Sequence, residues 1–331
     1  MATISVIVPC RNEAGHIDAF LSAALAQQLA AGDTLEVVVA DGASDDGTAQ
    51  KLAAWAVREP RLRVIDNPQR YTSAALNRAT AASSGDTIVR MDVHTDYAPD
   101  YVAQCQRALR ETGATCVGGA WQPVGASAIA RAFQSRFGSG GAASRRVDFN
   151  GEVDTVYLGA WRREDLLKLG GFDEALVRNQ DDELNLRIVR SGGRVWQSAA
   201  IRSWYTPRAS FMALFRQFHQ YGYWKVPVIR KHRLPASPRH LVPFGFVALL
   251  ALLAAGGLVW PTAWAALAGV LLLYAVVAFG NAALLSPRQA PAIAWAFACM
   301  HAGYGLGFGR GLLDFAVLRR GPAAAQTTLT R

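Results

Sequence analysis

A carboxylate and an imidazole follow a short apolar run near residue 90. The segment Ile88–Asp96 reads IVRMDVHTD, so Asp92 and His94 come directly after residues typical of a buried strand. If the backbone stays extended past Met91, side chains two positions apart point the same way and could bind one divalent cation. Carboxylate suits Mg²⁺ or Mn²⁺, whereas imidazole favours a transition metal. Alternatively, Asp92 and Asp96 are solvated or cap the next segment, because Asp is common in turns.

Apolar runs alternate with amphipathic stretches through the first hundred residues. The runs rich in Val, Ile and Leu are Ile4–Val8, Leu35–Ala40, Leu62–Ile65 and Thr87–Met91, and the amphipathic stretches are Ile17–Ala30, Gly47–Val57 and Ser73–Ala82. This alternation predicts an α/β fold, in which βα units build a mostly parallel sheet flanked by helices. In such sheets ligands bind beyond the carboxyl ends of the strands.

Polar residues follow three of these expected strands. They are Pro9, Arg11, Asn12 and Glu13 after the first strand, Asp41, Gly42, Ser44, Asp45, Asp46 and Gly47 after the second, and Asp92 and His94 after the fourth. Three polar strand ends on one edge predict one ligand site. A turn with a helix cap also explains residues 41–48, since Asp, Gly and Thr suit both. No GxGxxG or GxxxxGK[ST] sequence follows a strand, which argues against dinucleotide and Walker-type phosphate sites.

A second acidic cluster opens a predicted helix farther along the chain. Residues 179–183 read NQDDE and precede the apolar positions of a helix that runs through Val189. The helix dipole alone favours acids in a first helical turn. The functional alternative is that one of these carboxylates is the general base of a group transfer.

Charge is unevenly distributed along the 331 residues. Of the 25 acidic residues all but Asp314 lie at or before Glu183, so the net charge of +9 belongs to the second half. A basic half beside long apolar segments predicts a membrane surface as its anionic neighbour and argues against nucleic acid. The four cysteines form no CxxC pair, which indicates a reducing compartment. Because the first residues lack the features of a secretory signal, we expect the amino-terminal region to stay in the cytoplasm.

The last third of the chain is first basic and aromatic, then apolar. The segment 207–240 places aromatic residues at roughly helical spacing among Arg and Lys, which predicts a helix in the membrane interface, a helix packed against the first domain, or both. Segments 241–259 and 262–285 are each long enough to span a membrane and contain no charge. Segment 291–318 contains regularly spaced glycines that allow close helix packing, and we expect a third span or a re-entrant hairpin. The predicted domains are 1–206, 207–240 and 241–331, the last with two or three transmembrane helices.

These motifs, in this order, resemble those of family 2 glycosyltransferases. The matching segments extend over most of residues 1–225 and are Ile4–Pro9 with Asn12 and Glu13, Val39–Thr48, Ala75–Asn77, Met91–His94, Gly170–Glu174 and Gln180–Leu184. Within the family the chain is most similar to membrane-associated bacterial enzymes of exopolysaccharide synthesis, of the succinoglycan type. The resemblance implies a GT-A fold, a nucleotide-sugar donor, Mn²⁺ or Mg²⁺ as cofactor, and inversion at the anomeric carbon.

The resemblance also implies roles for individual residues. Asp41 matches the acid that contacts the nucleoside, and the other residues expected to bind the donor are Pro9, Arg11, Glu13, Gly42, Ser44, Asn77 and Asp92. Asp92 and His94 occupy the position of the DxD motif that binds the metal. His replaces the usual second Asp, so whether His94 or Asp96 joins Asp92 on the metal is left open.

The expected general base is Asp181. Asp182 is the alternative, because Gln180 replaces the Glu of the family's ED pair. The residues expected near the acceptor or the diphosphate are Trp161, Gln220, Tyr223, Trp224 and Lys225. Tyr223 stands where the QxxRW motif of processive synthases has Arg, which argues against a long-chain synthase.

We therefore expect an inverting glycosyltransferase of exopolysaccharide or cell-envelope glycan synthesis. It would move a sugar from a nucleotide-sugar donor, a UDP-sugar, to a polyprenyl-phosphate-linked or glycan acceptor. The protein would be a multi-pass protein of the cytoplasmic (inner) membrane, in contact with membrane lipid and with its catalytic domain in the cytoplasm. The rival hypothesis is a catalytically silent, glycosyltransferase-like membrane scaffold that binds nucleotide or a partner. The intact acids Asp41, Asp92 and Asp181 argue against it.

Overall fold

The computed structural model describes residues 1–328, and the chain divides into two compact units. Unit 1 comprises residues 1–122 and 143–206, and unit 2 comprises residues 123–142 together with the chain from residue 207 onward. The sequence analysis placed 123–142 in the first domain. This segment belongs to unit 2 because its helix α5 (Ala128–Gln134) packs against α12 (Ala290–Gly311).

Unit 1 is built around an eight-stranded sheet with the strand order β3-β2-β1-β4-β9-β6-β10-β8. Its strands are β1 (Thr3–Cys10), β2 (Thr34–Asp41), β3 (Leu62–Asp66), β4 (Thr87–Arg90), β6 (Cys116–Gly119), β8 (Gly151–Glu152), β9 (Tyr157–Arg162) and β10 (Val195–Gln197). β1 pairs in parallel with β2 and β4, β2 with β3, and β6 with β10. β9 runs antiparallel to β4 and β6, and β8 antiparallel to β10. The predicted mostly parallel sheet is therefore confirmed. A second, three-stranded sheet consists of β5 (Thr95–Tyr97), β11 (Ser203–Tyr205) and β7 (Trp121–Pro123).

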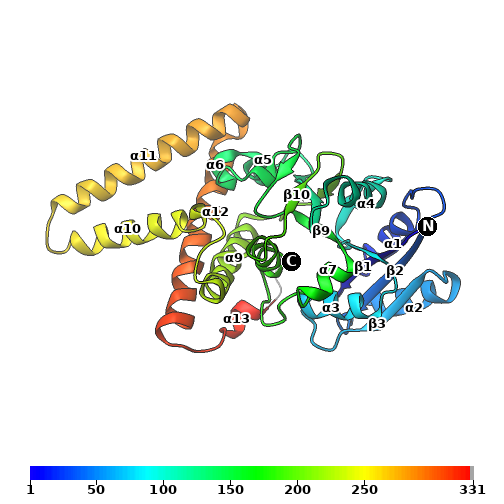
Figure 1. Ribbon diagram of the computed structural model, residues 1–331. Coiled ribbons are helices and arrows are strands. Elements are labelled where there is room, and N and C mark those ends of the chain that lie inside the picture. The colour runs from blue at the N-terminus through cyan, green and yellow to red at the C-terminus, as the bar shows by residue number, and fades with distance from the viewer. Residues whose placement is uncertain (329–331) are drawn as a thin grey trace. The chain divides into compact units, whose positions relative to one another are not determined.

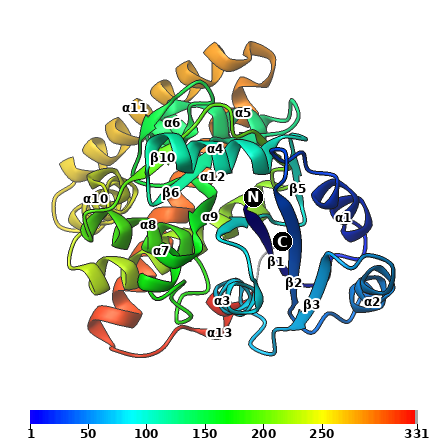
Figure 2. The same cartoon turned by 45° about the vertical axis from the view of Figure 1, so that its right-hand side comes forward.

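Helices cover both faces of the large sheet. They are α1 (Ile17–Leu25), α2 (Thr48–Arg58), α3 (Thr72–Ala82), α4 (Tyr101–Thr112), α7 (Arg163–Lys168) and α8 (Gln180–Arg190), with a 3₁₀ turn at Ala143–Arg145. Figure 2 shows α1 and α2 on one side of β1 to β3 and α3 on the other. Successive strand side chains point to opposite faces. Accordingly Val6 and Val8 belong to the core on the α1 and α4 side, whereas Ile7 belongs to the core on the α3 side.

Unit 2 is helical in its described part. It contains α5, α6 (Arg136–Ser139), α9 (Phe211–His232), α10 (Val242–Gly256), α11 (Thr262–Leu285), α12, a π-helical turn at Leu312–Val317, α13 (Ala324–Thr327) and 3₁₀ turns at Pro238–His240 and Pro287–Gln289. The long helices α10 and α11 lie side by side (Figure 1). The expected amphipathic segment forms the single helix α9, and residues on its buried face such as Leu214 and Val228 account for part of its apolar content.

Two helices within residues 1–328 are long and apolar enough to cross a membrane. They are Pro238–Gly256, with a mean hydropathy of 1.7, and Thr262–Leu285, with a mean hydropathy of 2.1. Large apolar side chains on both helices are exposed, as at Leu252 and Leu272, and only 0% and 6% of the two apolar windows is buried within the protein. The third expected segment forms α12, which packs along α9, and its crossing of a membrane stays a prediction.

Glycines let α9 and α12 touch backbone to backbone. A Cβ atom on Gly307 of α12 would lie 2.0 Å from the carbonyl oxygen of His219, and one on Gly222 of α9 would lie 2.0 Å from that of Tyr304. No side chain fits at these distances, and a helix backbone cannot move away without breaking other contacts. The close helix packing expected from the glycine spacing is therefore present.

We expect Gly307→Ala to lower the thermal stability of the detergent-solubilised protein. The added methyl group would meet backbone, and such overpacking costs about 1–3 kcal/mol or more. The matched control is Gly280→Ala in α11, where no heavy atom lies within 4 Å of the added Cβ. That change should be neutral or stabilising by up to ~1 kcal/mol, since Ala is the better helix former. An equal effect of both substitutions on the melting temperature would contradict the close contact.

Candidate functional site

The loops after β1 and β2 meet because the two strands are in parallel register. Cys10 at the end of β1 pairs with Asp41 at the end of β2, so both chains leave the sheet at the same level. Gly42 follows, and a Cβ atom there would come within 3.1 Å of the Cβ of Arg11. The glycine therefore leaves room for the Arg11 side chain to lie across the second loop.

Side-chain hydrogen bonds join these two loops. Three backbone N–H groups of the first loop donate to side chains of the second: Asn12 to Ser44 Oγ at 2.8 Å, Glu13 to Thr48 Oγ1 at 2.7 Å, and Ala14 to Asp46 Oδ2 at 3.0 Å. Asn12 and Asp45 add a reciprocal pair, in which each accepts from the other at 2.8 and 3.0 Å. Asp45 and Asp46 thus use their carboxylates to hold the loops together, as the turn alternative in the sequence analysis allowed.

Asp41 is the remaining acid of this segment and lies at the end of β2. Its side chain is buried, and it accepts from the Ser44 hydroxyl at 2.5 Å and from the Ser44 N–H at 3.2 Å. Ser44 therefore links Asp41 to the first loop through its bond to Asn12. The predicted donor-binding residues gather here: Pro9 and Asp41 lie at the ends of β1 and β2, and Arg11, Glu13, Gly42 and Ser44 lie in the loops that follow.

Asp92 is held by two neighbours. The chain turns at Val93 and His94, so the extended backbone that we expected past Met91 is absent. The Asp92 carboxylate instead faces Arg90, with Nε to Oδ1 at 2.9 Å and Nη2 to Oδ2 at 3.0 Å. The Asp92 N–H donates to the Tyr97 hydroxyl at 2.6 Å, and that hydroxyl donates to the Asp92 carbonyl at 3.1 Å. Burial, and after it the charge of Asp92, raises the pKa of Tyr97, so the phenol keeps its proton.

His94 faces the first loop. Its Nδ1 lies 3.6 Å from Glu13 Oε1, and the Nδ1 of His16 lies 3.4 Å from Glu13 Oε2. The His94 side chain is 46% exposed, and its ring meets Tyr205 edge to face at 6.1 Å. The third polar strand end therefore reaches the same edge as the first two.

A divalent metal at this edge would need further ligands from a substrate. In the part of the chain that the structure describes, no group of three or more His, Cys, Asp or Glu is arranged to hold a metal ion. Asp92 and His94 supply one carboxylate and one imidazole. Mg²⁺ and similar ions in nucleotide enzymes need only one or two carboxylates, because phosphate oxygens and water complete the shell. A metal bound together with a diphosphate is consistent with this donor set.

Asp181 begins α8 as expected. It is partly exposed, and one oxygen accepts from the Asp182 N–H at 2.9 Å. Glu183 is fully buried and pairs with Arg187 at 2.6 Å, so this third acid of the cluster has a structural role. Burial alone would lower the pKa of the Arg90 guanidinium. The negative charge of Asp92 raises this pKa, and the charge of Asp181 raises it by a smaller amount. Asp181 and Asp92 therefore act on the same guanidinium.

Asn77, predicted to bind the donor, and Trp161, predicted to lie near the acceptor, make other contacts in the structure. The Asn77 amide holds the loop after α7: its Oδ1 accepts from the Phe172 N–H, and its Nδ2 donates to the Phe172 carbonyl and to Glu174, all at 2.8 Å. Trp161 was expected near the acceptor, but it is only 1% exposed and packs edge to face on Phe172 at 5.7 Å. Its large apolar ring lies in the core between the sheet and α3, out of reach of an acceptor.

The predicted acceptor residues on α9 contact the end of the chain. We call residues 319–328 the C-terminal strap. Three α9 side chains bond its backbone: Gln220 Nε2 donates to the Thr328 carbonyl at 2.7 Å, Trp224 Nε1 donates to the Gln326 carbonyl at 3.0 Å, and the Tyr223 hydroxyl accepts from the Ala323 N–H at 3.2 Å. Lys225 is also buried. These side chains hold the strap in this structure.

A buried acid fastens the start of the strap. Asp314 is 0% exposed and accepts from the Tyr223 hydroxyl at 3.0 Å, from Arg310 at 3.1 Å and from Arg320 at 2.6 Å. Two arginines and a phenol thus satisfy one carboxylate, which a fully buried charge requires. Tyr223 stands in place of the Arg of the QxxRW motif. Its hydroxyl donates to Asp314 and accepts from a backbone N–H of the strap.

The sequence analysis missed Arg90. Its only signal is a charge inside an apolar run, two positions before an acid. Such a residue is ordinarily read as the solvent-facing position of a strand, whereas here it is 6% exposed and part of the site.

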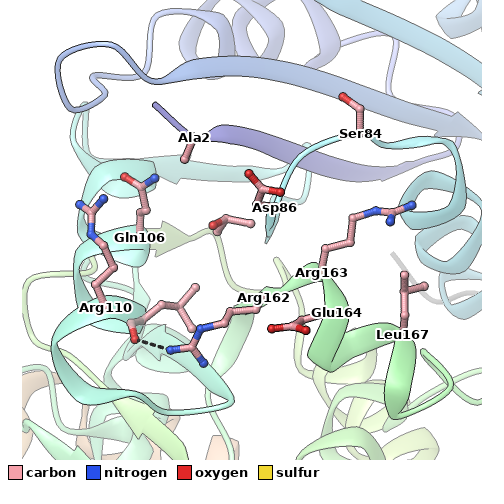
Figure 3. Close-up of a pocket in the computed structure, with 11 residues that line it drawn as sticks. Ala2, Ser84, Asp86, Gln106, Arg110, Arg162, Arg163, Glu164 and Leu167 are labelled. Carbon is pink, nitrogen blue, oxygen red and sulfur yellow. Dashed lines mark hydrogen bonds between the residues drawn. The ribbon is translucent and has the colours of Figure 1, made fainter.

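A pocket of about 530 Å³ lies at the opposite edge of the sheet, where β1 and β4 begin (Figure 3). Its lining includes Asp86, Arg110, Arg162 and Arg163, and Arg162 donates to the Leu109 carbonyl at 3.0 Å. None of the predicted site residues lines it. In Figure 3 the Arg110 and Arg163 side chains diverge from Asp86, so they do not form one anion clamp.

Comparison with known proteins gives a family and relatives that match over most of the chain. The profile of "Glycosyl transferase family 2" matches residues 5–170. "Succinoglycan biosynthesis protein ExoA" of Rhizobium meliloti (strain 1021) is 34% identical over 326 residues, which are 94% of this chain and 95% of that protein. A dolichyl N-acetyl-alpha-D-glucosaminyl phosphate 3-beta-D-2,3-diacetamido-2,3-dideoxy-beta-D-glucuronosyltransferase of Methanococcus voltae is 25% identical, over 76% of this chain and 80% of that protein.

Two solved structures share the fold. The mannosyltransferase PcManGT from Pyrobaculum calidifontis, in complex with GDP-Man and Mn²⁺, has a TM-score of 0.61 at 22% identity and covers 94% of this chain and 87% of its own. S. aureus TarS 1–349, in complex with UDP, has a TM-score of 0.50 at 16% identity, with coverages of 93% and 90%. The expected GT-A fold is confirmed.

We expect Thr48→Val to loosen the joint between the two loops. The change removes the oxygen that accepts the buried Glu13 N–H, and an unsatisfied buried donor costs about 1–3 kcal/mol. Exchange of the Glu13 amide hydrogen should therefore accelerate roughly tenfold or more in hydrogen-exchange mass spectrometry. Thr80→Val is the matched control, because buried Thr80 bonds only the Leu76 carbonyl of its own helix. Unchanged exchange at Glu13 in Thr48→Val would contradict the role given to this hydroxyl.

Proposed function

The chain belongs to glycosyl transferase family 2, and from that premise we propose that it is an inverting transferase of exopolysaccharide or cell-envelope glycan synthesis. The donor is a nucleotide sugar, which we take to be a UDP-sugar. The acceptor is a polyprenyl-phosphate-linked or other glycan at the cytoplasmic face of the membrane. The full-length similarity to a succinoglycan biosynthesis protein supports the exopolysaccharide role, and the dolichyl phosphate substrate named for the Methanococcus relative supports a lipid-linked acceptor.

The observation that carries the proposal is the meeting of three strand ends at one edge. The loops after β1 and β2 are bonded to each other, and His94 after β4 faces Glu13 of the first loop. Ligands of parallel α/β sheets bind at this edge. In the proposal Asp41 contacts the nucleoside, and Pro9, Arg11 and Glu13 bind the donor beside it.

Asp92 and His94 are the residues that would hold Mn²⁺ or Mg²⁺ with the diphosphate. The bound metal would supply charge neutralisation on the leaving oxygens. The chain's own contribution is to keep the Asp92 carboxylate in place through Arg90 and the Asp92 backbone through Tyr97. A carboxylate held in this way would keep the metal in position, so that no reorganisation is needed when negative charge develops on the leaving group.

Asp181 is the general base of the proposed reaction. Its carboxylate takes the proton of the acceptor hydroxyl as that oxygen forms a bond to the anomeric carbon. The bond from the anomeric carbon to the diphosphate oxygen breaks, and the nucleoside diphosphate leaves with the electron pair. Attack from the opposite face gives a single displacement with inversion. Asp182 is the alternative base, one residue further into α8.

Two features of the chain support the proposal that the acceptor is bound at a membrane. Helices α10 and α11 are apolar enough to span it, and the chain after Glu183 carries the basic charge that lipid phosphates attract. In the proposed topology the glycosyltransferase domain is cytoplasmic. The interfacial role of 207–240 and the acceptor role of Gln220, Tyr223, Trp224 and Lys225 belong to the same proposal.

Replacement of the proposed base distinguishes an effect on sugar transfer from an effect on nucleotide binding. Asp181→Asn should lower transfer about 100-fold or more, because a general base typically contributes 10²–10⁴ in rate. Nucleotide affinity should stay within about twofold, since the base acts mainly in the transition state. Asp182→Asn is the matched control and should keep most of the activity. The reverse pattern would assign the base to Asp182. Full activity in both variants would remove this cluster from the mechanism.

Metal removal tests the donor site. We would measure nucleotide release by the lipid-reconstituted protein from UDP-, GDP- and dTDP-sugars with Mn²⁺, Mg²⁺ or EDTA. EDTA should abolish release from the one accepted donor, and either cation should restore it, because the diphosphate needs charge neutralisation to leave. Asp92→Ala should not be restored by added metal. Metal-dependent nucleotide binding without release from any donor, even with a lipid-linked acceptor present, would favour the scaffold hypothesis.

A further inference from the structure

Arg90 is a buried cation beside the metal-binding acid. It ends β4 and is 6% exposed, within a run whose other members are Ile88, Val89 and Met91. Burial of a guanidinium costs free energy unless acids pair with it. Removing either member of such a pair leaves the other as an uncompensated buried charge. The buried charge of Asp92 is therefore compensated by Arg90.

Arg90 directs two of its three side-chain nitrogens at one carboxylate. Nε and Nη2 each meet a different oxygen of Asp92, which is the bidentate geometry that guanidinium and carboxylate prefer. The third nitrogen, Nη1, is buried and has no hydrogen-bond partner within residues 1–328. The charge of Asp181 also acts on the same guanidinium. Arg90 thus lies in the field of both the metal-binding acid and the base.

The charges of Asp92 and Arg90 cancel within their pair. Asp92 contributes one negative charge and Arg90 one positive charge, and two hydrogen bonds hold the two groups together. Glu13, an acid of the first loop, faces the imidazoles of His16 and His94. Affinity for hard divalent cations rises with the negative charge of the ligand set. A carboxylate already paired with a guanidinium offers a cation little attraction unless another ligand brings negative charge.

We propose that Arg90 is a positioning residue that competes with the divalent cation for Asp92, so that the cation binds tightly only together with the diphosphate of the donor. This inference rests on the proposed function, which supplies the diphosphate. The diphosphate brings the negative charge that Asp92 lacks while it is paired with Arg90. Cation and nucleotide then strengthen each other's binding by the same factor, as linkage requires.

A purely structural Arg90 would have the opposite effect on metal binding. If Arg90 only oriented Asp92, its loss would disorder the carboxylate and weaken the cation site. If Arg90 competes, its loss removes a positive charge next to the cation and strengthens the site. The sign of the change in metal affinity without nucleotide therefore separates the two roles.

The test measures binding of Mn²⁺ alone to the detergent-solubilised full chain, from the electron paramagnetic resonance signal of free Mn²⁺. The wild type should bind with a Kd of about 1 mM or weaker, as expected for a site of low ligand charge. Arg90→Gln should bind at least about tenfold more tightly, because one repelling charge is gone. Arg90→Lys keeps the charge and should stay within about threefold of the wild type.

Two further variants locate the effect. Adding Asp92→Asn to Arg90→Gln should abolish the increase in Mn²⁺ affinity, since Asp92 is the ligand that Arg90→Gln releases from its ion pair. Arg107→Gln changes the net charge equally, and it removes an exposed ion pair with Glu111 on α4, so it should leave Mn²⁺ binding unchanged. Unchanged or weaker Mn²⁺ binding in Arg90→Gln, or an equal gain in Arg107→Gln, would overturn the proposal.

Nucleotide binding gives a second readout. In the wild type, UDP, GDP or dTDP, whichever binds, should tighten Mn²⁺ binding by more than about tenfold, and Arg90→Gln should reduce this factor. If Arg90→Gln does not fold, the wild type alone decides, because Mn²⁺ binding that is independent of nucleotide contradicts the proposal. Failure of the proposed function looks different: no nucleotide then binds with or without metal, while the comparison of Mn²⁺ alone still tests Arg90.

Discussion

The parallel register of β1 with its two neighbours is the constraint on which the site depends. It sets the ends of β1 and β2 at one level, so that short side chains such as Ser44 and Thr48 can reach backbone N–H groups across the gap. It also sets Ile7 opposite Arg90, which places the guanidinium at the same edge. A register shift of one residue would turn every side chain to the other face and separate these partners.

Electrostatics at this edge follow from burial. The acids that hold the loops, Asp45 and Asp46, are exposed and bond to backbone or amide groups, whereas Asp92 is enclosed and needs a cation. The structure meets that need with Arg90 and leaves Asp181 at a helix start that is partly open to solvent. The buried Arg90 guanidinium compensates the charge of the enclosed Asp92 carboxylate while the strand around them stays apolar. Fold and chemistry are thereby coupled through a single side chain.

Local patterns predict most of this fold, and long-range contacts explain what they miss. Apolar runs and the NQDDE helix start are visible in the sequence because their signals are periodic and contiguous. The turn at Val93 and His94 bonds the Tyr97 phenol just beyond it. The burial of Trp161 depends on a core built from several elements, and the role of Asn77 depends on Phe172, 95 residues away. Arg90 was missed for the same reason, since alternation along a strand does not say which face is covered. The assignment of 123–142 to unit 2 likewise rests on a contact with α12 that no local pattern encodes.

The C-terminal strap has a consequence for how its sequence can vary. Gln220, Tyr223 and Trp224 bond main-chain atoms of the strap, at Thr328, Ala323 and Gln326. Bonds of this kind are insensitive to side-chain identity but sensitive to spacing, because each lies a fixed number of residues beyond Asp314. Insertion or deletion in the segment would therefore break them, whereas side-chain identity matters at Arg320, whose guanidinium pairs with Asp314.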